Sequence, residues 1–333
     1  MRAAPFAIRK QALQEYSRRP GRCLATRNGG LWNRKLRGAY ALGILHGELT
    51  GETMTLPQRS FLFVPANRPD RFDKALACGA DAVVIDLEDA VPPENKTEAR
   101  HSVAAWLATH HRVIVRINAA DTPWFKDDLA LARLPGVAGI MLPKTERIDE
   151  VFSVSCIGAG TAVFPMIETA AGLHNVHTIA RAQGVQRLVF GSIDFQLDLG
   201  ISGDELELLP YRAQLVMASR LARLGAPIDG VSTSIDDQAA LTADTLRSRR
   251  LGFGAKLCIH PKQVGAVNAA FCATAEELAW ARRVLEAAAR SAGAAVAVDG
   301  KMVDRPVMMR AQAIVQEAGE RALKLAGTAG AQA

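Results

Sequence analysis

The sequence predicts an α/β protein, a (β/α)₈ (TIM) barrel followed by a C-terminal helical arm. Eight short apolar runs follow one another between residues 59 and 260, and segments with helical spacing separate most of them. This alternation is typical of right-handed βαβ units, and eight units suit a barrel of about 250 residues. The alternative is a doubly wound open sheet. It loses support because neither G-x-G-x-x-G after the first run nor G-x-x-x-x-G-K-[ST] occurs.

The apolar runs are the predicted strands. They are short and nearly continuous in hydrophobicity, as expected for parallel strands buried on both faces. They cover residues 61–65, 82–87, 113–117, 138–142, 162–167, 187–190, 228–231 and 256–259. Helices are expected between them, for example at residues 70–77, 94–108, 126–133, 170–182, 208–224 and 236–248. Asp70 is expected to cap the first of these helices, and Asp236 and Asp237 precede the last.

The chain is expected to have three parts, at residues 1–53, 54–290 and 291–333. The middle part is the catalytic barrel, with a helix at 275–291 near its end. The last part is an arm with a small hairpin around Asp299-Gly300 and a helix at 306–325. Because the barrel does not need this arm, we expect it to cover the site or to reach a neighbouring subunit.

The positive charge of the chain lies in residues 1–53. This segment holds ten Lys and Arg against three Glu, whereas the whole chain carries +6, so residues 54–333 carry one net negative charge. The segment is interpreted as a mobile tail or a non-native extension before Met54. An organelle transit peptide and a nucleic-acid-binding arm are the alternatives. Cleavage before Met54 is expected to leave activity intact.

Five scattered cysteines without a C-x-x-C pair favour a reducing, cytoplasmic location and argue against a cysteine zinc site. No apolar run reaches the roughly 18 residues of a membrane span, and the N-terminus lacks a secretory signal. Neither a membrane nor a nucleic-acid partner is therefore expected.

Charged residues gather where the predicted strands end, which is where a barrel places its chemistry. Glu168 and Asp194 follow adjacent strands, so their carboxylates are expected to meet. Carboxylates in a partly buried mouth repel one another unless a cation joins them, and oxygen ligands favour Mg²⁺ or Mn²⁺. Arg116 offers a planar fork for a carboxylate or an enolate oxygen. These groups suit carbon–carbon cleavage or formation beside a carbonyl.

The motifs resemble those of the citrate lyase β-subunit family, whose relatives include malyl-CoA and citramalyl-CoA lyases of the 2-oxo-acid (HpcH/HpaI) aldolase superfamily. The resemblance covers residues 57–325. One departure is Ala66, where the family usually has Gly. The matching motifs lie at residues 59–71, 85–91, 115–118, 141–144, 165–169, 190–194, 258–261 and 299–304.

The resemblance implies a role for each matching residue. Glu168 and Asp194 would be the Mg²⁺ ligands, and Arg116 would bind the 2-oxo-acid part of the substrate. Asp304, supplied by the arm of an adjacent subunit, would be the acid/base group. Further substrate contacts are expected from residues around the mouth. Asp86 and Glu88 would orient metal-bound waters, Lys74 and Arg68 would contact coenzyme A phosphates, and Ile259 and His260 would line the mouth.

Some of these residues, and a few others, have alternative interpretations. Lys144 at a strand end is a candidate Schiff-base lysine, but carboxylate-rich sites favour the metal route. His174 and His177 share a helix face without a third ligand, which indicates surface or packing residues. The His260-Pro261 pair is equally typical of a structural strand end.

These observations predict a Mg²⁺-dependent lyase that cleaves a 3-hydroxyacyl-CoA of the malyl-CoA or citramalyl-CoA type to acetyl-CoA and a 2-oxo acid. It is expected to act as a homotrimer or hexamer. One alternative is a citrate lyase β-subunit acting on a carrier-bound citryl thioester. Another is a metal-dependent aldolase acting on free hydroxy acids. A scaffold or nucleic-acid-binding protein is the non-enzymatic alternative.

Overall fold

The computed structural model describes residues 58–108, 112–157, 160–290 and 296–330. The chain divides into two units, Met1–Met54 and Thr55–Ala333, and every described residue belongs to the second. The predicted basic extension, residues 1–53, therefore lies outside the described residues. Within the described part, no helix is long and apolar enough to cross a membrane.

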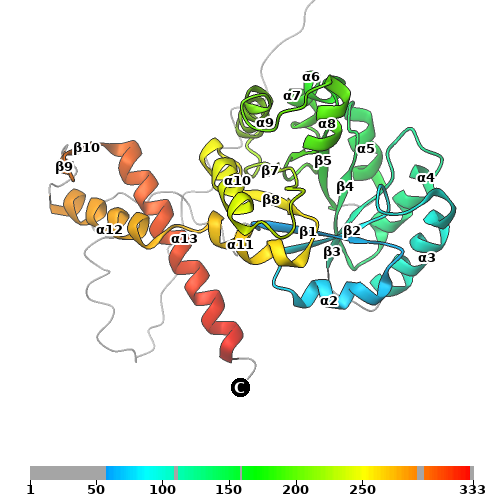
Figure 1. Cartoon of the computed structure of the whole chain (residues 1–333), viewed down its shortest axis with the longest axis horizontal. Helices are drawn as coiled ribbons and strands as arrows, with labels where there is room; N and C mark the ends of the chain where they lie inside the picture. Colours follow the sequence, from blue (N-terminus) through cyan, green and yellow to red (C-terminus); the bar gives the residue numbers. More distant parts are fainter. Residues whose placement is uncertain (1–57, 109–111, 158–159, 291–295, 331–333) are drawn as a thin grey trace, which may run out of the picture. The chain divides into compact units, whose positions relative to one another are not determined.

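Eight parallel strands form a closed barrel in sequence order, and β8 pairs with β1 to complete it (Figure 1). The predicted fold class is therefore confirmed. Each strand lies within two residues of its predicted bounds. The strands are β1 (Ser60–Pro65), β2 (Ala82–Asp86), β3 (Val113–Arg116), β4 (Val137–Leu142), β5 (Ala162–Ile167), β6 (Val189–Phe190), β7 (Ile228–Asp229) and β8 (Ala255–Cys258).

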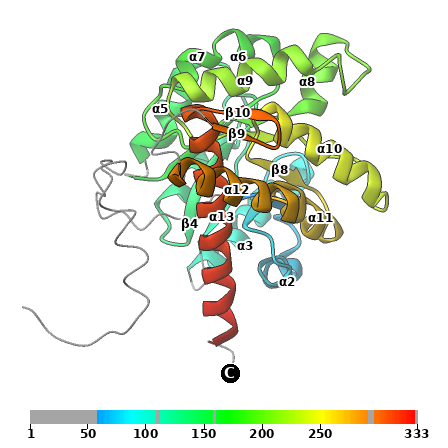
Figure 2. The ribbon, with the colours of Figure 1, turned by 90° about the vertical axis from the view of Figure 1, so that its left-hand side faces the viewer.

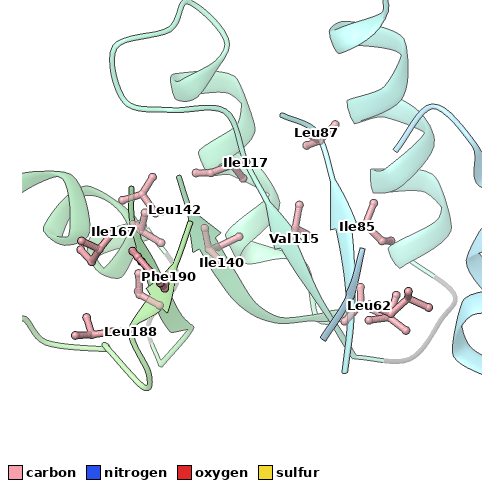
Figure 3. Packing of buried hydrophobic residues seen from close by; sticks show 14 of the residues in the cluster. Leu62, Ile85, Leu87, Val115, Ile117, Ile140, Leu142, Ile167, Leu188 and Phe190 are labelled. Atoms are coloured by element: carbon pink, nitrogen blue, oxygen red, sulfur yellow. The ribbon is translucent and has the colours of Figure 1, made fainter. Parts of the chain in front are cut away.

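Apolar side chains pack on both sides of the barrel wall, which explains why the strands are continuously hydrophobic. Phe61 and Phe164 meet edge to face inside the barrel, with ring centroids 6.1 Å apart. Alternate residues face outward and pack against the helices. Figure 3 shows this layer with Leu62, Ile85, Val115, Ile140 and Phe190 among its buried members.

Helices or helical turns follow the strands at the predicted places. The structure adds α5 (Ile148–Ile157), α8 (Ser192–Leu199) and α11 (Pro261–Phe271), which are not among the predicted examples. The others are η1 (Pro69–Arg71), α2 (Phe72–Ala77), η2 (Pro93–Asn95), α3 (Lys96–Leu107), α4 (Phe125–Asp128), η3 (Leu129–Arg133), α6 (Ala170–His174), α7 (Val176–Ile179), α9 (Leu209–Leu221) and α10 (Gln238–Leu251).

One of the two capping predictions was wrong. Asp70 makes no side-chain cap; its carboxylate instead accepts two hydrogen bonds from Arg68, both at 2.9 Å. Asp237 does cap α10, because its Oδ1 accepts the Ala240 N–H at 2.9 Å. A nearby arginine competes for Asp70, so the sequence position of an acid before a helix does not by itself fix its partner.

The predicted arm consists of α12 (Ala275–Arg290), the hairpin β9 (Val296–Val298) and β10 (Lys301–Val303), and α13 (Arg305–Gly330). Asp299 and Gly300 form the turn with φ of 53° and 73°, as a two-residue hairpin of this kind requires. Helices α12 and α13 pack together, with the hairpin between them in the chain (Figure 2). Ala281, Val284 and Val303 belong to the arm's own small apolar core.

Buried charges also lie on the outer face of the wall, between β7, β8 and helices α9 and α10. We call Arg212, Asp229, Asp244, Arg247 and Lys256 the outer cluster. Asp229 accepts from Arg212 Nε at 3.1 Å and from the Ser248 hydroxyl. Asp244 lies 2.7 Å from Lys256 Nζ and 2.5 Å from Arg247 Nη2. Each buried carboxylate here has at least one cationic partner, so the cluster joins helices to strands without an unpaired acid.

Candidate active site

Asp86 and Arg116 form the first part of the site. They end β2 and β3 and are partners in the register of these neighbouring strands. Arg116 Nε donates to Asp86 Oδ1 at 2.7 Å and Nη2 donates to Oδ2 at 2.6 Å, a bidentate pair. The guanidinium lies over the Phe63 ring, 4.6 Å from its centroid. The fork that the sequence predicted for substrate is therefore held in place by a buried carboxylate and an aromatic face.

Two further acids, Glu88 and Asp89, approach the same guanidinium. Arg116 Nη1 lies 2.9 Å from Glu88 Oε2 and 3.3 Å from Asp89 Oδ2. The other oxygen of Glu88 accepts from Lys144 Nζ at 2.6 Å. Among the described residues, hydrogen bonds to Asp86 and Asp89 occupy three of the five N–H groups of Arg116, and one Nη2 hydrogen is left for a substrate oxygen.

Glu168 follows β5 directly and is 1% exposed. Its Oε1 accepts the backbone N–H of Lys144. Gly191 lies beside it, and a Cβ at that position would come within 2.3 Å of Glu168 Oε2, so the close approach requires glycine. Burial, then the charges of Glu88 and Asp194, raise the pKa of Glu168 to about 8.

Asp194 lies further from its strand than the sequence predicted. It is the third residue of α8 and not the end of β6, which stops at Phe190. Its charge nevertheless acts on Glu168, and the two residues line one pocket. The first turn of α8 presents backbone N–H groups, which favour a carboxylate there.

A pocket of about 400 Å³ opens where these strands end. Its charged wall contains Asp86, Asp89, Arg116, Glu168 and Asp194. Its apolar wall is formed by side chains from inside the barrel and from the loops that follow the strands. These include Phe63, Met166, Phe190, Val231, Leu257 and Ile259. The pocket thus combines few charged groups with an apolar lining, as small-molecule sites commonly do.

Glu168 and Asp194 fit a hard divalent cation. Burial and, after it, the negative charges of Glu88 and Asp194 raise the pKa of Glu168, and a cation between Glu168 and Asp194 would offset the repulsion between their carboxylates. Within the described ranges, no group of three or more His, Cys, Asp and Glu residues is arranged to enclose a metal. Two carboxylates agree with Mg²⁺, which keeps its other positions for water and substrate oxygens.

Lys144 is not arranged as a Schiff-base lysine. Although burial acts to lower it, the hydrogen bond and charge of Glu88 raise the pKa of Lys144 above its ordinary value. An amine that stays protonated is a poor nucleophile. The structure therefore favours the metal route over the covalent one.

The other predicted site residues lie in several places. Ile259 lines the pocket, whereas His260 does not; its Nδ1 accepts the Lys262 N–H at 3.2 Å and caps α11. His174 and His177 are exposed on α6 and α7, as expected for surface residues. This placement supports the structural interpretation of the His-Pro pair.

The predicted coenzyme A contacts and the acid/base residue lie outside the pocket lining. Lys74 is exposed on α2, and Arg68 is paired with Asp70. Asp304 is exposed, and its Oδ1 accepts the Val307 N–H at 3.2 Å at the start of α13. None of the three lines the pocket of its own chain.

Sequence reasoning missed two contributors to the site, Phe63 and Asp89. Phe63 supports the guanidinium of Arg116, and Asp89 contacts Nη1. The alternation of inward side chains along 61–65 would have placed Phe63 inside the barrel. No comparable sequence signal distinguishes Asp89 from a solvated loop acid.

The barrel and the acid-rich ends of its strands together define a TIM-barrel protein with an oxygen-ligand site. The model of the HpcH/HpaI aldolase/citrate lyase family matches residues 59–261, and the chain belongs to this family. The predicted family resemblance is thus confirmed.

The matches of this chain with its relatives extend over nearly the whole length of each relative. The citrate lyase subunit beta-like protein of Deinococcus radiodurans is 38% identical over 274 residues, covering 77% of this chain and 96% of that protein. The (3S)-malyl-CoA thioesterase of Cereibacter sphaeroides is 31% identical, covering 78% and 96%. The structure of CitE from Mycobacterium tuberculosis with magnesium, acetoacetate and coenzyme A has a TM-score of 0.71 and 33% identity, covering 79% of this chain and 98% of that one.

Proposed function

We propose that this protein is a Mg²⁺-dependent lyase that cleaves a 3-hydroxyacyl-CoA of the malyl-CoA or citramalyl-CoA type. The observation that carries the proposal is that the buried Glu168, Asp194 and Arg116 line one pocket. The CitE structure with magnesium, acetoacetate and coenzyme A supports it, because its ligands combine a divalent cation, a small oxo acid and a thiol carrier.

Different residues of the chain bind the metal, bind the substrate and exclude water in the proposed reaction. Mg²⁺ held by Glu168 and Asp194 supplies positive charge to the oxygens of the 2-oxo acid. Arg116 donates its remaining Nη2 hydrogen to the same acid, and Asp86 fixes the guanidinium. The apolar side chains of the pocket exclude water, which strengthens these interactions.

Asp304 is the proposed acid/base group, supplied by the arm of a second copy of the chain. It removes the proton from the substrate hydroxyl. The carbon–carbon bond then breaks, and its electron pair passes to the α-carbon of the thioester. The products are a 2-oxo acid and the enolate of acetyl-CoA, which takes up a proton to give acetyl-CoA. Exposure of Asp304 at the start of α13 supports action on a neighbour, in a homotrimer or hexamer.

Lys74 and Arg68 are proposed to contact the phosphates of coenzyme A. Both are exposed basic residues that follow β1, so neither must leave a buried partner to bind an anion. The ion pair of Arg68 with Asp70 lies at the surface and costs little to break.

The relative named (3S)-malyl-CoA thioesterase supports a second candidate, hydrolysis of the same thioester. A carrier-bound citryl thioester and a free hydroxy acid are the other substrates to exclude. All four activities use the same carboxylate pair and differ in their products or in the carrier.

A substrate panel with Mg²⁺ tests the proposal. The protein is incubated with malyl-CoA, β-methylmalyl-CoA, citramalyl-CoA and citryl-CoA, and both 2-oxo acid and free thiol are measured. We expect 2-oxo acid with acetyl-CoA and no free thiol. Free thiol without 2-oxo acid would identify a thioesterase. If Glu168→Ala kept full Mg²⁺-dependent cleavage, the proposed metal site would be wrong.

A further inference from the structure

Lys144 links the two buried glutamates of the site. It follows β4 in a left-handed conformation, with φ of 46°, which is uncommon for a residue with a side chain. Its backbone N–H donates to Glu168, and its Nζ donates to Glu88 Oε1 at 2.6 Å. One residue therefore contacts both carboxylates. Strained backbone of this kind is typical of functional sites.

Glu88 is held by cations at both ends of its carboxylate. Lys144 contacts Oε1, and Arg116 Nη1 lies 2.9 Å from Oε2. Its side chain is 7% exposed. Asp86, which ends β2, and Asp89, in the loop that follows, line the pocket, whereas Glu88 does not. The two cations thus keep Glu88 out of the space that Glu168 and Asp194 face.

We propose that Lys144 is a positioning residue that prevents Glu88 from becoming a third metal ligand. The inference rests on the proposed function, in which Glu168 and Asp194 hold Mg²⁺. A third carboxylate would tighten the hold on the metal, because affinity for hard cations grows with ligand charge. It would also occupy a position that a chelating 2-oxo acid needs. Lys144 therefore keeps metal affinity lower and the metal open to substrate.

The test replaces Lys144 by methionine, which keeps the length of the side chain and the backbone N–H. Calorimetry measures binding of Mg²⁺ alone, and then of oxalate, a chelating mimic of a 2-oxo acid, to the Mg²⁺-loaded protein. We expect Lys144→Met to bind Mg²⁺ about fivefold or more tightly than the unaltered protein and to bind oxalate more weakly. Unchanged or weaker Mg²⁺ binding by a folded variant would overturn the inference.

Loss of a positive charge near the metal is a competing explanation for tighter binding. The Glu88→Gln variant and the double variant with Lys144→Met distinguish ligation by Glu88 from a simple charge effect, because glutamine is a poor replacement for a charged ligand. We expect Lys144→Met to change Mg²⁺ affinity by less than about twofold in the Glu88→Gln background. The same tightening in both backgrounds would show a simple charge effect and overturn the inference. Lys144→Arg, which keeps the charge, should restore affinity close to that of the unaltered protein.

Two further measurements keep the result interpretable. Thermal unfolding without metal checks that each variant folds, and Lys144→Gln replaces the methionine variant if that one does not. Glu168→Gln tests the proposed function separately. If it bound Mg²⁺ as well as the unaltered protein does, the metal site itself would be misassigned. If it lost binding while Lys144→Met showed no Glu88-dependent tightening, only the inference about Lys144 would fail.

Discussion

The outer cluster and the residues around the pocket are both groups of buried charges on one barrel, but their charge balance differs. We call Asp86, Glu88, Asp89, Arg116, Lys144, Glu168 and Asp194 the mouth cluster. In the outer cluster, Asp229 has Arg212 as partner, and Asp244 has Lys256 and Arg247. Although burial acts to raise it, the charge and hydrogen bond of Lys256 lower the pKa of Asp244.

In the mouth cluster, burial and neighbouring acids act in the same direction. They raise the pKa of Glu168 to about 8, and burial raises the pKa of Glu88 despite the opposing charges of Arg116 and Lys144. Five carboxylates lie here, whereas among the described residues the cations in contact with them are Arg116 and Lys144. The acids of the outer cluster each have a cationic partner, whereas the acids of the mouth cluster outnumber the cations that contact them, as is common at sites that bind a cation or a substrate.

The largest effect is expected from Glu168→Gln. Removing this proposed metal ligand should lower Mg²⁺-dependent cleavage by about 10³-fold, because metal stabilisation of developing charge contributes several kcal/mol. In EDTA the same variant should unfold at an equal or higher temperature, because a crowded buried acid is gone. A large drop in the unfolding temperature would mean that Glu168 belongs to a balanced, structural cluster.

The second prediction concerns the outer cluster. Asp229→Ala leaves Arg212, whose side chain is 2% exposed, without its buried partner. We expect the free energy of unfolding to fall by about 3–5 kcal/mol, with little change in Mg²⁺ affinity. Asp204→Ala is the matched control, because Asp204 pairs with the same arginine from a half-exposed position. It should cost less than about 1 kcal/mol. If urea unfolding showed the same loss of unfolding free energy for both variants, the distinction between a buried and a half-exposed partner of Arg212 would be wrong.

Gly191→Ala tests how tightly Glu168 is positioned. A Cβ there would lie 2.3 Å from Oε2 and 2.7 Å from Cβ of Glu168, so the glutamate must move. We expect Mg²⁺ affinity to fall about 10–100-fold. Gly265→Ala is the control, because nothing lies within 4 Å of its added Cβ in α11. That variant should bind Mg²⁺ normally and gain up to about 1 kcal/mol of helix stability. Normal Mg²⁺ binding by Gly191→Ala would show that Glu168 is not the ligand.

The smallest effect is a pH dependence of the metal-free fold. Because the folded protein raises the pKa of Glu168 from 4.5 to about 8, the protonated acid contributes stability at low pH. That contribution is fully present below pH 4.5 and is lost as the pH rises to about 8. Thermal unfolding in EDTA should show this loss, and saturating Mg²⁺ should reverse it by binding the ionised form. The Glu168→Gln variant should lack the reversal.

The strands and the charged strand ends could be predicted because their signals are local. A parallel strand buried on both faces is nearly apolar throughout; Asp86 and Arg116 end such strands, and Glu168 directly follows one. Asp194 was predicted less well because β6 is short and α8 begins at once, so the aspartate enters a helix.

The outer cluster could not be predicted, because its pairs join elements that only folding brings together. Asp229 and Lys256 lie inside runs interpreted as apolar strands, and their partners come from α9 and α10. The left-handed backbone conformation of Lys144 could not be predicted from the sequence either, because lysine has no preference for that conformation. The contact of Lys144 with two acids follows from this backbone and from β2, β4 and β5 being brought together.

The central claim of the proposed function is that Glu168 and Asp194 bind a divalent cation in the mouth cluster. Calorimetric titration with Mg²⁺ near pH 7, repeated in buffers with different ionisation enthalpies, tests it most directly. We predict one Mg²⁺ per chain with release of a proton, because Glu168 is largely protonated below its pKa of about 8. Glu168→Gln should bind at least about 100-fold more weakly and release no proton. Mg²⁺ binding that is unaffected by this substitution, or that releases no proton from the unaltered protein, would contradict the account.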